Sequence, residues 1–204
     1  GIIMIMKTLK AIAASLVMAT SASAAVTYDD VSHTLKVTGT TTTAQVNAAF
    51  MQMHEHDVLT VELAGPGGEY YAGLALGKMI QREGATVLIR ENTECVSACA
   101  FAALGGEKIV VDGLLKFHVP FMTYVPTNAT ILEVAQRFGL GYLDMPMYLA
   151  DVGVTINFAN VLMKETSHCK FFVVDDEAEI AKLKDIEAPN QRVSIQHTIL
   201  DTCR

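Results

Sequence analysis

Residues 91–106, ENTECVSACAFAALGG, place one serine between two cysteines, where an extended run gives way to a short apolar stretch. The preceding residues 85–91, ATVLIRE, predict a strand, and the alanine-rich residues 97–104 predict a helix. Ser97 therefore lies at a predicted strand-to-helix turn. A serine there has two interpretations. Its hydroxyl caps the helix, or it is a nucleophile held away from the sheet, with the N–H of Ala98 facing an oxyanion.

Outward from this turn, predicted strands and helices alternate. The predicted strands cover residues 33–40, 58–65, 85–91, 107–111, 114–119 and 170–174. The predicted helices cover residues 43–56, 69–83 and 97–104, most of 130–165 with breaks near Gly139 and Gly153, and a segment that starts at Asp176. This order predicts an α/β fold with a layered β-α repeat core and a helical C-terminal half.

Two further features lie at predicted strand ends. Gly65-Pro66-Gly67-Gly68 follows an apolar strand and precedes a helix, so it is either a tight turn or a place where backbone N–H groups approach a ligand. His118 ends a strand ahead of Pro120, where a histidine is either structural or a general base. Because parallel strands bring their C-termini to one edge, we expect the glycine turn, Ser97 and His118 to lie together.

These stretches carry a resemblance to a known family. GPGGEYYAGLALGKMI, CVSACAFAALGGEKIVV and FHVP resemble the motifs of the Clp protease proteolytic subunit and its exported relatives in the ClpP/crotonase superfamily. In that family a Pro-Gly-Gly turn precedes a helix, the nucleophile lies in a Ser-Ala turn, and the base lies at a His-x-Pro strand end. The resemblance implies a ClpP/crotonase-like fold that needs no cofactor. It implies Ser97 as nucleophile, His118 as base, and the N–H groups of Gly67 or Gly68 and Ala98 as oxyanion donors.

The acidic third member of this catalytic set stays open. The resemblance is close over residues 35–120 and holds only in outline over the helical remainder. The family's acid lies shortly before the last strand, at a position that Thr166 occupies here, with Glu165 beside it. Asp144 and Asp151 are other candidates on the preceding helical stretch. Without an acid the base would be less well oriented, and activity would be lower.

The N-terminus has the features of a secretory signal peptide. Lys7 and Lys10 form a basic leader, residues 11–19 form a short apolar stretch, and Ala22-Ser23-Ala24 supplies the small residues of a cleavage site. We expect residues 1–24 to be a signal peptide, residues 25–204 to form a single domain, and the mature protein to be periplasmic. A retained N-terminal anchor is the alternative.

The cysteines are expected to form disulfides after export. Cys95, Cys99, Cys169 and Cys203 are an even number, although four cysteines allow three pairings. Cys95 and Cys99 straddle a sharp turn that could bring their Cα atoms within disulfide range, so we predict a bridge between them. The second predicted bridge, from Cys169 to Cys203, would tether the C-terminal tail.

Charge and histidine spacing exclude several kinds of partner. The formal net charge is −7 and no lysine or arginine cluster stands out, so neither nucleic acid nor an anionic membrane is expected. His54 and His56 point to different faces of a predicted helix, so they cannot share a metal ion. We expect a peptide or protein substrate, self-association through residues 130–165 as in the family, and no ATPase partner.

Three functions follow from this reading. The first is an exported serine hydrolase, and specifically a peptidase, that uses Ser97 and His118. The second is a catalytically inactive binding or assembly protein on the same scaffold. The third, a crotonase-type acyl-CoA enzyme, is disfavoured because export separates the protein from the coenzyme pool and because it leaves the serine–histidine pair unexplained.

Overall fold

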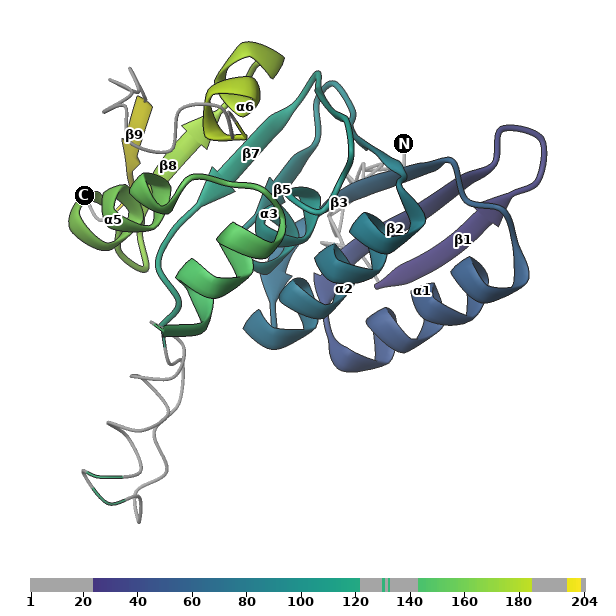
Figure 1. The fold of residues 1–204 in the computed structure, drawn as a ribbon, viewed down its shortest axis with the longest axis horizontal. Helices are drawn as coiled ribbons and strands as arrows, with labels where there is room; N and C mark the ends of the chain where they lie inside the picture. Colours follow the sequence, from purple (N-terminus) through teal and green to yellow (C-terminus); the bar gives the residue numbers. More distant parts are fainter. Residues whose placement is uncertain (1–23, 122–129, 131, 133–142, 185–197, 203–204) are drawn as a thin grey trace, which may run out of the picture.

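The protein is α/β with a mixed β-sheet, as Figure 1 shows. The structure, a computed structural model, describes residues 24–121, 130, 132, 143–184 and 198–202. Its strands are β1 (Ala25–Asp29), β2 (Thr34–Thr41), β3 (Thr60–Gly68), β4 (Thr86–Ile89), β5 (Glu94–Val96), β6 (Ile109–Val111), β7 (Leu114–Phe117), β8 (Lys170–Val174) and β9 (Thr198–Asp201). Its helices are α1 (Thr43–Glu55), α2 (Tyr70–Glu83), α3 (Ala98–Ala103), α5 (Ile156–Glu165) and α6 (Glu177–Leu183), together with the helical residues 143–151.

The sheet branches at β3. The first half of β3, Thr60 to Glu62, pairs in parallel with β4, whereas Gly65 pairs in parallel with β5. One branch holds β1, β2, β4 and β6, of which only β1 is antiparallel to its neighbour. The other branch continues from β5 to β7 in parallel and to β8 and β9 in antiparallel. The C-terminal ends of β3, β5 and β7 therefore meet at one edge.

The chain changes branch twice, and each change takes a sharp bend. Between β4 and β5 it turns at Asn92, whose φ is 61°. Between β6 and β7 it turns at Gly113, where a Cβ atom would lie 2.3 Å from the carbonyl oxygen of Arg90 and 2.4 Å from that of Thr93. Only glycine fits so close to that backbone. These bends place the short strand β5 immediately before Ser97.

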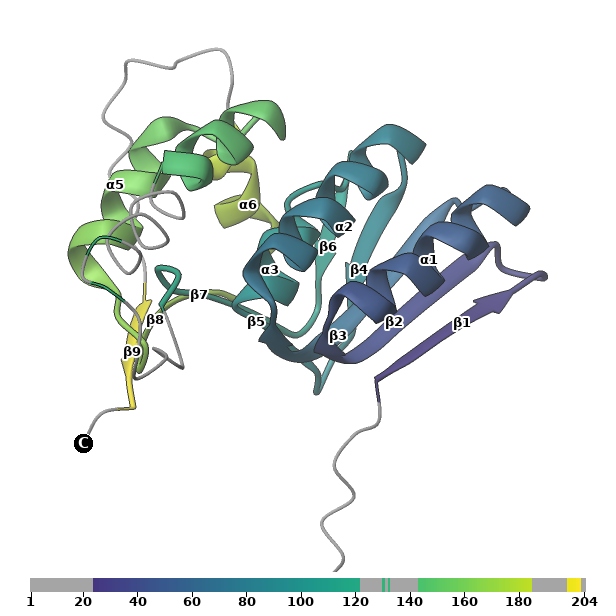
Figure 2. The same ribbon diagram turned by 90° about the horizontal axis from the view of Figure 1, so that it is seen from below.

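Helices α1, α2 and α3 cover one face of the sheet side by side, as Figure 2 shows. Small residues allow α2 and α3 to approach closely, since a Cβ atom on Gly73 would lie 2.3 Å from the carbonyl oxygen of Ala98. The helical residues 143–151 pack beside them, and Tyr148 donates a hydrogen bond to the Phe101 carbonyl at 2.6 Å. Helix α3, which begins directly after Ser97, is thus held on several sides.

One hydrophobic core extends from β2 to α6. Phenylalanine rings join its two halves, with edge contacts between Phe101 and Phe117 at 5.7 Å, Phe117 and Phe158 at 5.2 Å, and Phe158 and Phe172 at 5.1 Å between ring centres. All four rings are buried. Edge-on pairs of this kind add about 0.5–1.5 kcal/mol each beyond the area that they bury. The core therefore ties the strand before His118 to the C-terminal half.

Most predicted elements are confirmed within a few residues. Helix α2 ends at Gly84, which adopts a left-handed φ of 63°, and Gly153, with a φ of 76°, separates residues 143–151 from α5. The predicted break at Gly139 and the signal peptide up to residue 23 lie outside the described residues. Among the helices that the structure describes, none is both long and apolar enough to cross a membrane.

Candidate functional site

Ser97 stands at the bend between β5 and α3 in a strained backbone conformation. Its φ is 56° and its ψ is −119°, a combination that costs a non-glycine residue about 1–3 kcal/mol. Ser97 occupies the N-cap position of α3, yet its side chain makes no capping hydrogen bond. The capping interpretation thus lacks the bond that would justify it. Strain at a strand-to-helix turn is the arrangement that presents a nucleophilic serine above a sheet.

A disulfide fixes the turn around this serine. Cys95 is the middle residue of β5 and Cys99 is the second residue of α3, and their sulfur atoms are bonded with the Cα atoms 5.2 Å apart. This confirms the predicted first bridge. Cys169 is also disulfide-bonded, while Cys203, its predicted partner, lies outside the described residues.

The glycine turn at the end of β3 lies directly against Ser97. A Cβ atom on Gly67 would lie 2.6 Å from the Val96 carbonyl oxygen, 2.8 Å from the Cβ atom of Ser97 and 3.1 Å from the Ala98 nitrogen. Gly67 also has a φ of 89°, which side chains disfavour. The Cβ position of Gly68 faces β2 instead, 2.2 Å from the carbonyl oxygen of Thr41. The absence of a side chain at Gly67 therefore allows the end of β3 to pack directly against the turn that holds Ser97.

The backbone amide of Ala98 is the best-placed oxyanion donor among those predicted. Ala98 is the first residue of α3. The hydrogen bond from the Phe101 amide to the Ser97 carbonyl, at 3.0 Å, closes the first turn of this helix. The Ala98 amide has no acceptor among the described residues. An uncommitted N–H next to a nucleophile can stabilise the negative charge of a tetrahedral intermediate.

His118 follows the strand next to that of Ser97. Strands β5 and β7 run parallel, and the Ser97 amide donates to the Lys116 carbonyl at 2.8 Å, so both residues lie at the same sheet edge. The His118 side chain makes no hydrogen bond with Ser97, whose hydroxyl has no partner within the described parts of the chain. Such contacts are often longer in a free enzyme than in its substrate complex. The structure thus brings the two residues to neighbouring strand ends without joining them.

Burial and aromatic packing define the state of the His118 ring. The residue is 5% exposed, and its ring contacts those of Phe121 and Phe171, each with ring centres 5.1 Å apart. Burial lowers the pKa of His118 below its ordinary value of 6.5, and His168 adds to the lowering, although the bond to Val119 opposes it. The ring is therefore neutral at neutral pH, as a general base must be.

A backbone carbonyl holds the His118 ring in one orientation. The Nδ1 atom lies 2.7 Å from the carbonyl oxygen of Val119. Because a carbonyl oxygen only accepts hydrogen bonds, Nδ1 carries the proton, and Nε2 of the neutral ring carries the lone pair. The carbonyl thus orients the ring, and in most catalytic triads a carboxylate orients the histidine in the same way.

None of the predicted acids is shown bound to His118. Thr166, at the position of the family's acid, does lie close by: its hydroxyl accepts from the Val119 amide at 3.0 Å and donates to the Leu162 carbonyl. Asp144 accepts a hydrogen bond from Tyr71, and Asp151 pairs with Lys78 at 2.7 Å. Glu165 is the last residue of α5.

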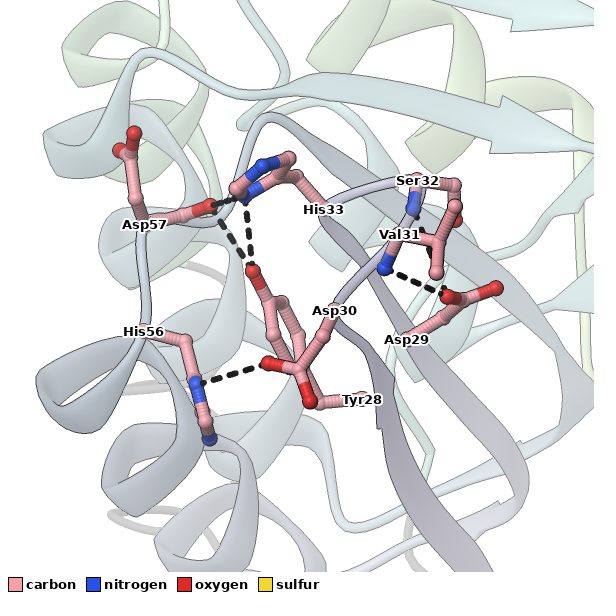
Figure 3. Close-up of polar contacts among 8 residues, drawn as sticks. All are labelled: Tyr28, Asp29, Asp30, Val31, Ser32, His33, His56 and Asp57. Carbon is pink, nitrogen blue, oxygen red and sulfur yellow. Dashed lines mark hydrogen bonds and ion pairs between the residues drawn. The ribbon is translucent and has the colours of Figure 1, made fainter.

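A second polar cluster joins Tyr28 and the residues after it to His56 and Asp57, as Figure 3 shows. The Tyr28 hydroxyl lies 3.0 Å from Nδ1 of His33 and donates to the Asp57 carbonyl at 3.1 Å, while the Tyr28 ring stacks on His56. His56 also lies 3.6 Å from Asp30. This cluster precedes β2 and joins the end of α1 to the β1–β2 turn, so it is far from the edge with Ser97 and is structural.

Metal ligation has no support in the described residues, which contain no group of three or more His, Cys, Asp or Glu side chains arranged around a common point.

No protein-family model matches the chain, and a search of curated proteins finds no match either. Function is therefore inferred from the geometry of Ser97, Gly67 and His118.

Proposed function

We propose that this protein is an exported serine hydrolase, and specifically a peptidase, with a ClpP/crotonase-like fold. Ser97 attacks the carbonyl carbon of the substrate, and Nε2 of His118 takes the hydroxyl proton and later gives it to the leaving group. The Ala98 amide, with an amide of the Gly67–Gly68 turn, holds the oxyanion. The proposal requires neither a metal ion nor another cofactor.

The observation that carries the proposal is the backbone of Ser97. A serine with a φ of 56° and no capping bond has no evident structural reason to be strained. Two neighbours hold that conformation: the Cys95–Cys99 disulfide, which spans the turn, and Gly67, which packs directly against Ser97. Strain that is maintained by its surroundings is typical of functional residues.

The state of His118 provides the second support. Its pKa is lowered by burial, its Nδ1 atom is committed to the Val119 carbonyl, and it follows the strand adjacent to Ser97. A buried neutral histidine with a fixed tautomer is suited to accept a proton from a serine. For Nε2 to reach Ser97 Oγ, the hydroxyl rotates towards the ring when a substrate binds.

Turnover of an activated ester tests the proposal. Ser97→Ala and His118→Ala should each lower the hydrolysis of p-nitrophenyl acetate on the order of 10³-fold, and the double variant should lose little more because the pair acts as a unit. Ser32→Ala, at an exposed serine in the β1–β2 turn, is the matched control and should keep full activity. Undiminished turnover in Ser97→Ala would contradict the assignment of Ser97 as nucleophile, whereas a folded wild-type protein without turnover would favour a binding or assembly protein on this scaffold.

We also propose that the protein self-associates through the segment 130–165. Leu143 and Met147 lie one turn apart on the helical residues 143–151, and each is 67% exposed. Exposed apolar side chains on one helix face are suited to a protein partner. Met147→Glu should shift the mass measured by light scattering from oligomer to monomer at micromolar concentration, and an unchanged mass would exclude this face.

A further inference from the structure

A cavity of about 450 Å³ lies at the far end of α3 from Ser97. It is bounded by the end of α2, by the Gly105-Gly106 turn that follows α3, and by residues 150–153. Lys184, the C-cap residue of α6, also lines it and donates a hydrogen bond from Nζ to the Gly106 carbonyl. The volume is sufficient for a small organic molecule.

The Lys184 amine is unusual in its surroundings. It is partly buried and makes no ion pair with any residue that the structure describes. Burial lowers its pKa from 10.5 to about 8. At pH 7 about one such amine in ten is neutral, whereas fewer than about one in a thousand ordinary lysine amines are. Lys184 therefore offers a free lone pair under conditions in which exposed lysines do not.

Other charged groups at the cavity do not make it an anion site. Asp151 and Glu107 line it, and Asp151 pairs with Lys78 of α2, so the nearby charges nearly balance. The amides of Gly105, Gly106, Glu107 and Gly153 all donate to other backbone carbonyls. A carboxylate or phosphate would thus find few donors besides Lys184 itself, and a neutral ligand fits better.

We propose that Lys184 is a nucleophilic amine that condenses with a small aldehyde or ketone held in this cavity. The nitrogen attacks the carbonyl carbon and the carbonyl oxygen takes up a proton. The resulting carbinolamine loses one water molecule to leave a C=N bond to Nζ. Proton transfers between the amine and the departing water balance the reaction, which needs no oxidant or reductant. This site is separate from the hydrolytic site proposed at Ser97.

Reductive trapping with propionaldehyde and cyanoborohydride tests this inference in the whole protein. Peptide mapping by mass spectrometry at pH 7 should find the propyl adduct on Lys184 at least about tenfold faster than on Lys182, an exposed lysine of the same helix that serves as the internal control. Equal or slower labelling of Lys184 in the wild-type protein would overturn the proposal without any variant.

Two variants separate the amine from the cavity. Lys184→Met should abolish that adduct while ester hydrolysis at Ser97 stays unchanged, so failure here is distinct from failure of the proposed hydrolase. Ala150→Phe places a ring at the cavity wall and should slow labelling of Lys184 about tenfold but leave Lys182 unaffected. Labelling of Lys184 that is insensitive to Ala150→Phe would show that the cavity does not hold the aldehyde, and would overturn the inference.

Discussion

The serine side and the histidine side of the candidate site are held by different means. Covalent and backbone constraints fix Ser97: a disulfide across its turn and a glycine whose missing side chain faces it. Side-chain packing fixes His118, through two aromatic rings and one bond to the Val119 carbonyl. The serine side should therefore be sensitive to small changes in backbone and volume, whereas the histidine side should respond chiefly to pH.

Among changes to the residues that support Ser97 and His118, the largest effect should come from adding one methyl group on the serine side. Gly67→Ala introduces a Cβ atom 2.6 Å from the Val96 carbonyl oxygen at a φ of 89°. Strain and overpacking together should cost about 2–4 kcal/mol of unfolding free energy, measured by urea denaturation, and should lower turnover on the order of 100-fold.

Gly84→Ala is the matched control for that change. Gly84 also has a positive φ, of 63°, but only the Glu107 side chain lies near its Cβ position, at 3.3 Å. Its replacement should cost only about 1 kcal/mol and leave turnover intact. Equal losses of turnover and of unfolding free energy in the two variants would show that the close packing of Gly67 against Ser97 has no special role.

Removing the disulfide should have the next largest effect. Cys95→Ser combined with Cys99→Ser opens a five-residue loop, counting Cys95 to Cys99 inclusive, which lowers the unfolding free energy by about 2 kcal/mol on the chain-entropy model. The strained φ of Ser97 should then relax, and turnover should fall more than stability alone explains. A double variant that keeps wild-type turnover at a temperature where it is fully folded would contradict the role assigned to the bridge.

Lowering the pH should inactivate the protein through protonation of His118. The folded-state pKa of His118 is lowered, so turnover should fall only as the pH drops below the ordinary value of 6.5. The unfolded chain takes up the proton more readily than the folded protein. The contribution of His118 to stability is therefore present above pH 6.5 and is lost as the pH falls towards the folded-state pKa. A turnover profile with its midpoint above pH 6.5 would be inconsistent with a buried His118 as the base.

Changes at the candidate acids should have the smallest effects. Because the Val119 carbonyl orients His118, the single variants Asp144→Asn, Asp151→Asn and Glu165→Gln should each lower turnover less than about tenfold. In a triad that depends on its acid, the corresponding loss is about 10⁴-fold. A loss of that size in any one of the three would identify the missing acid and replace the carbonyl in this account.

The sequence predicted the parallel core because its strands are apolar runs and its helices end at recognisable residues such as Gly84. It predicted the strand-to-helix turn at Ser97, the strand end at His118 and the Cys95–Cys99 bridge. It missed β5, since three residues are too short for a periodic signal and the bend at Asn92 has no strong marker. It also missed β1 and β9, the first and last strands of the main strand order, which have no buried residue.

The surroundings of His118 could not be derived from the sequence for a physical reason. Phe171 and Thr166 reach the ring or its strand through tertiary packing with a segment far along the chain. Phe121, only three residues after His118, contacts the ring through the local path of the backbone. The hydrogen bond from His118 to the Val119 carbonyl cannot be predicted from residue type, because every residue has a backbone carbonyl. The positive φ of Ser97 could not be predicted from the sequence either. Only the position of Ser97 at a strand-to-helix turn could be.

Labelling with a serine-directed fluorophosphonate tests the central claim most directly. We expect the wild-type protein at pH 7.5 to form one covalent adduct per chain, on the peptide that contains Ser97, and we expect Ser97→Ala to form none. His118→Ala should slow the labelling by orders of magnitude, because the serine loses its base. A wild-type protein that is folded but acquires no adduct at Ser97, or acquires it equally fast without His118, would contradict the claim that these two residues form a catalytic pair.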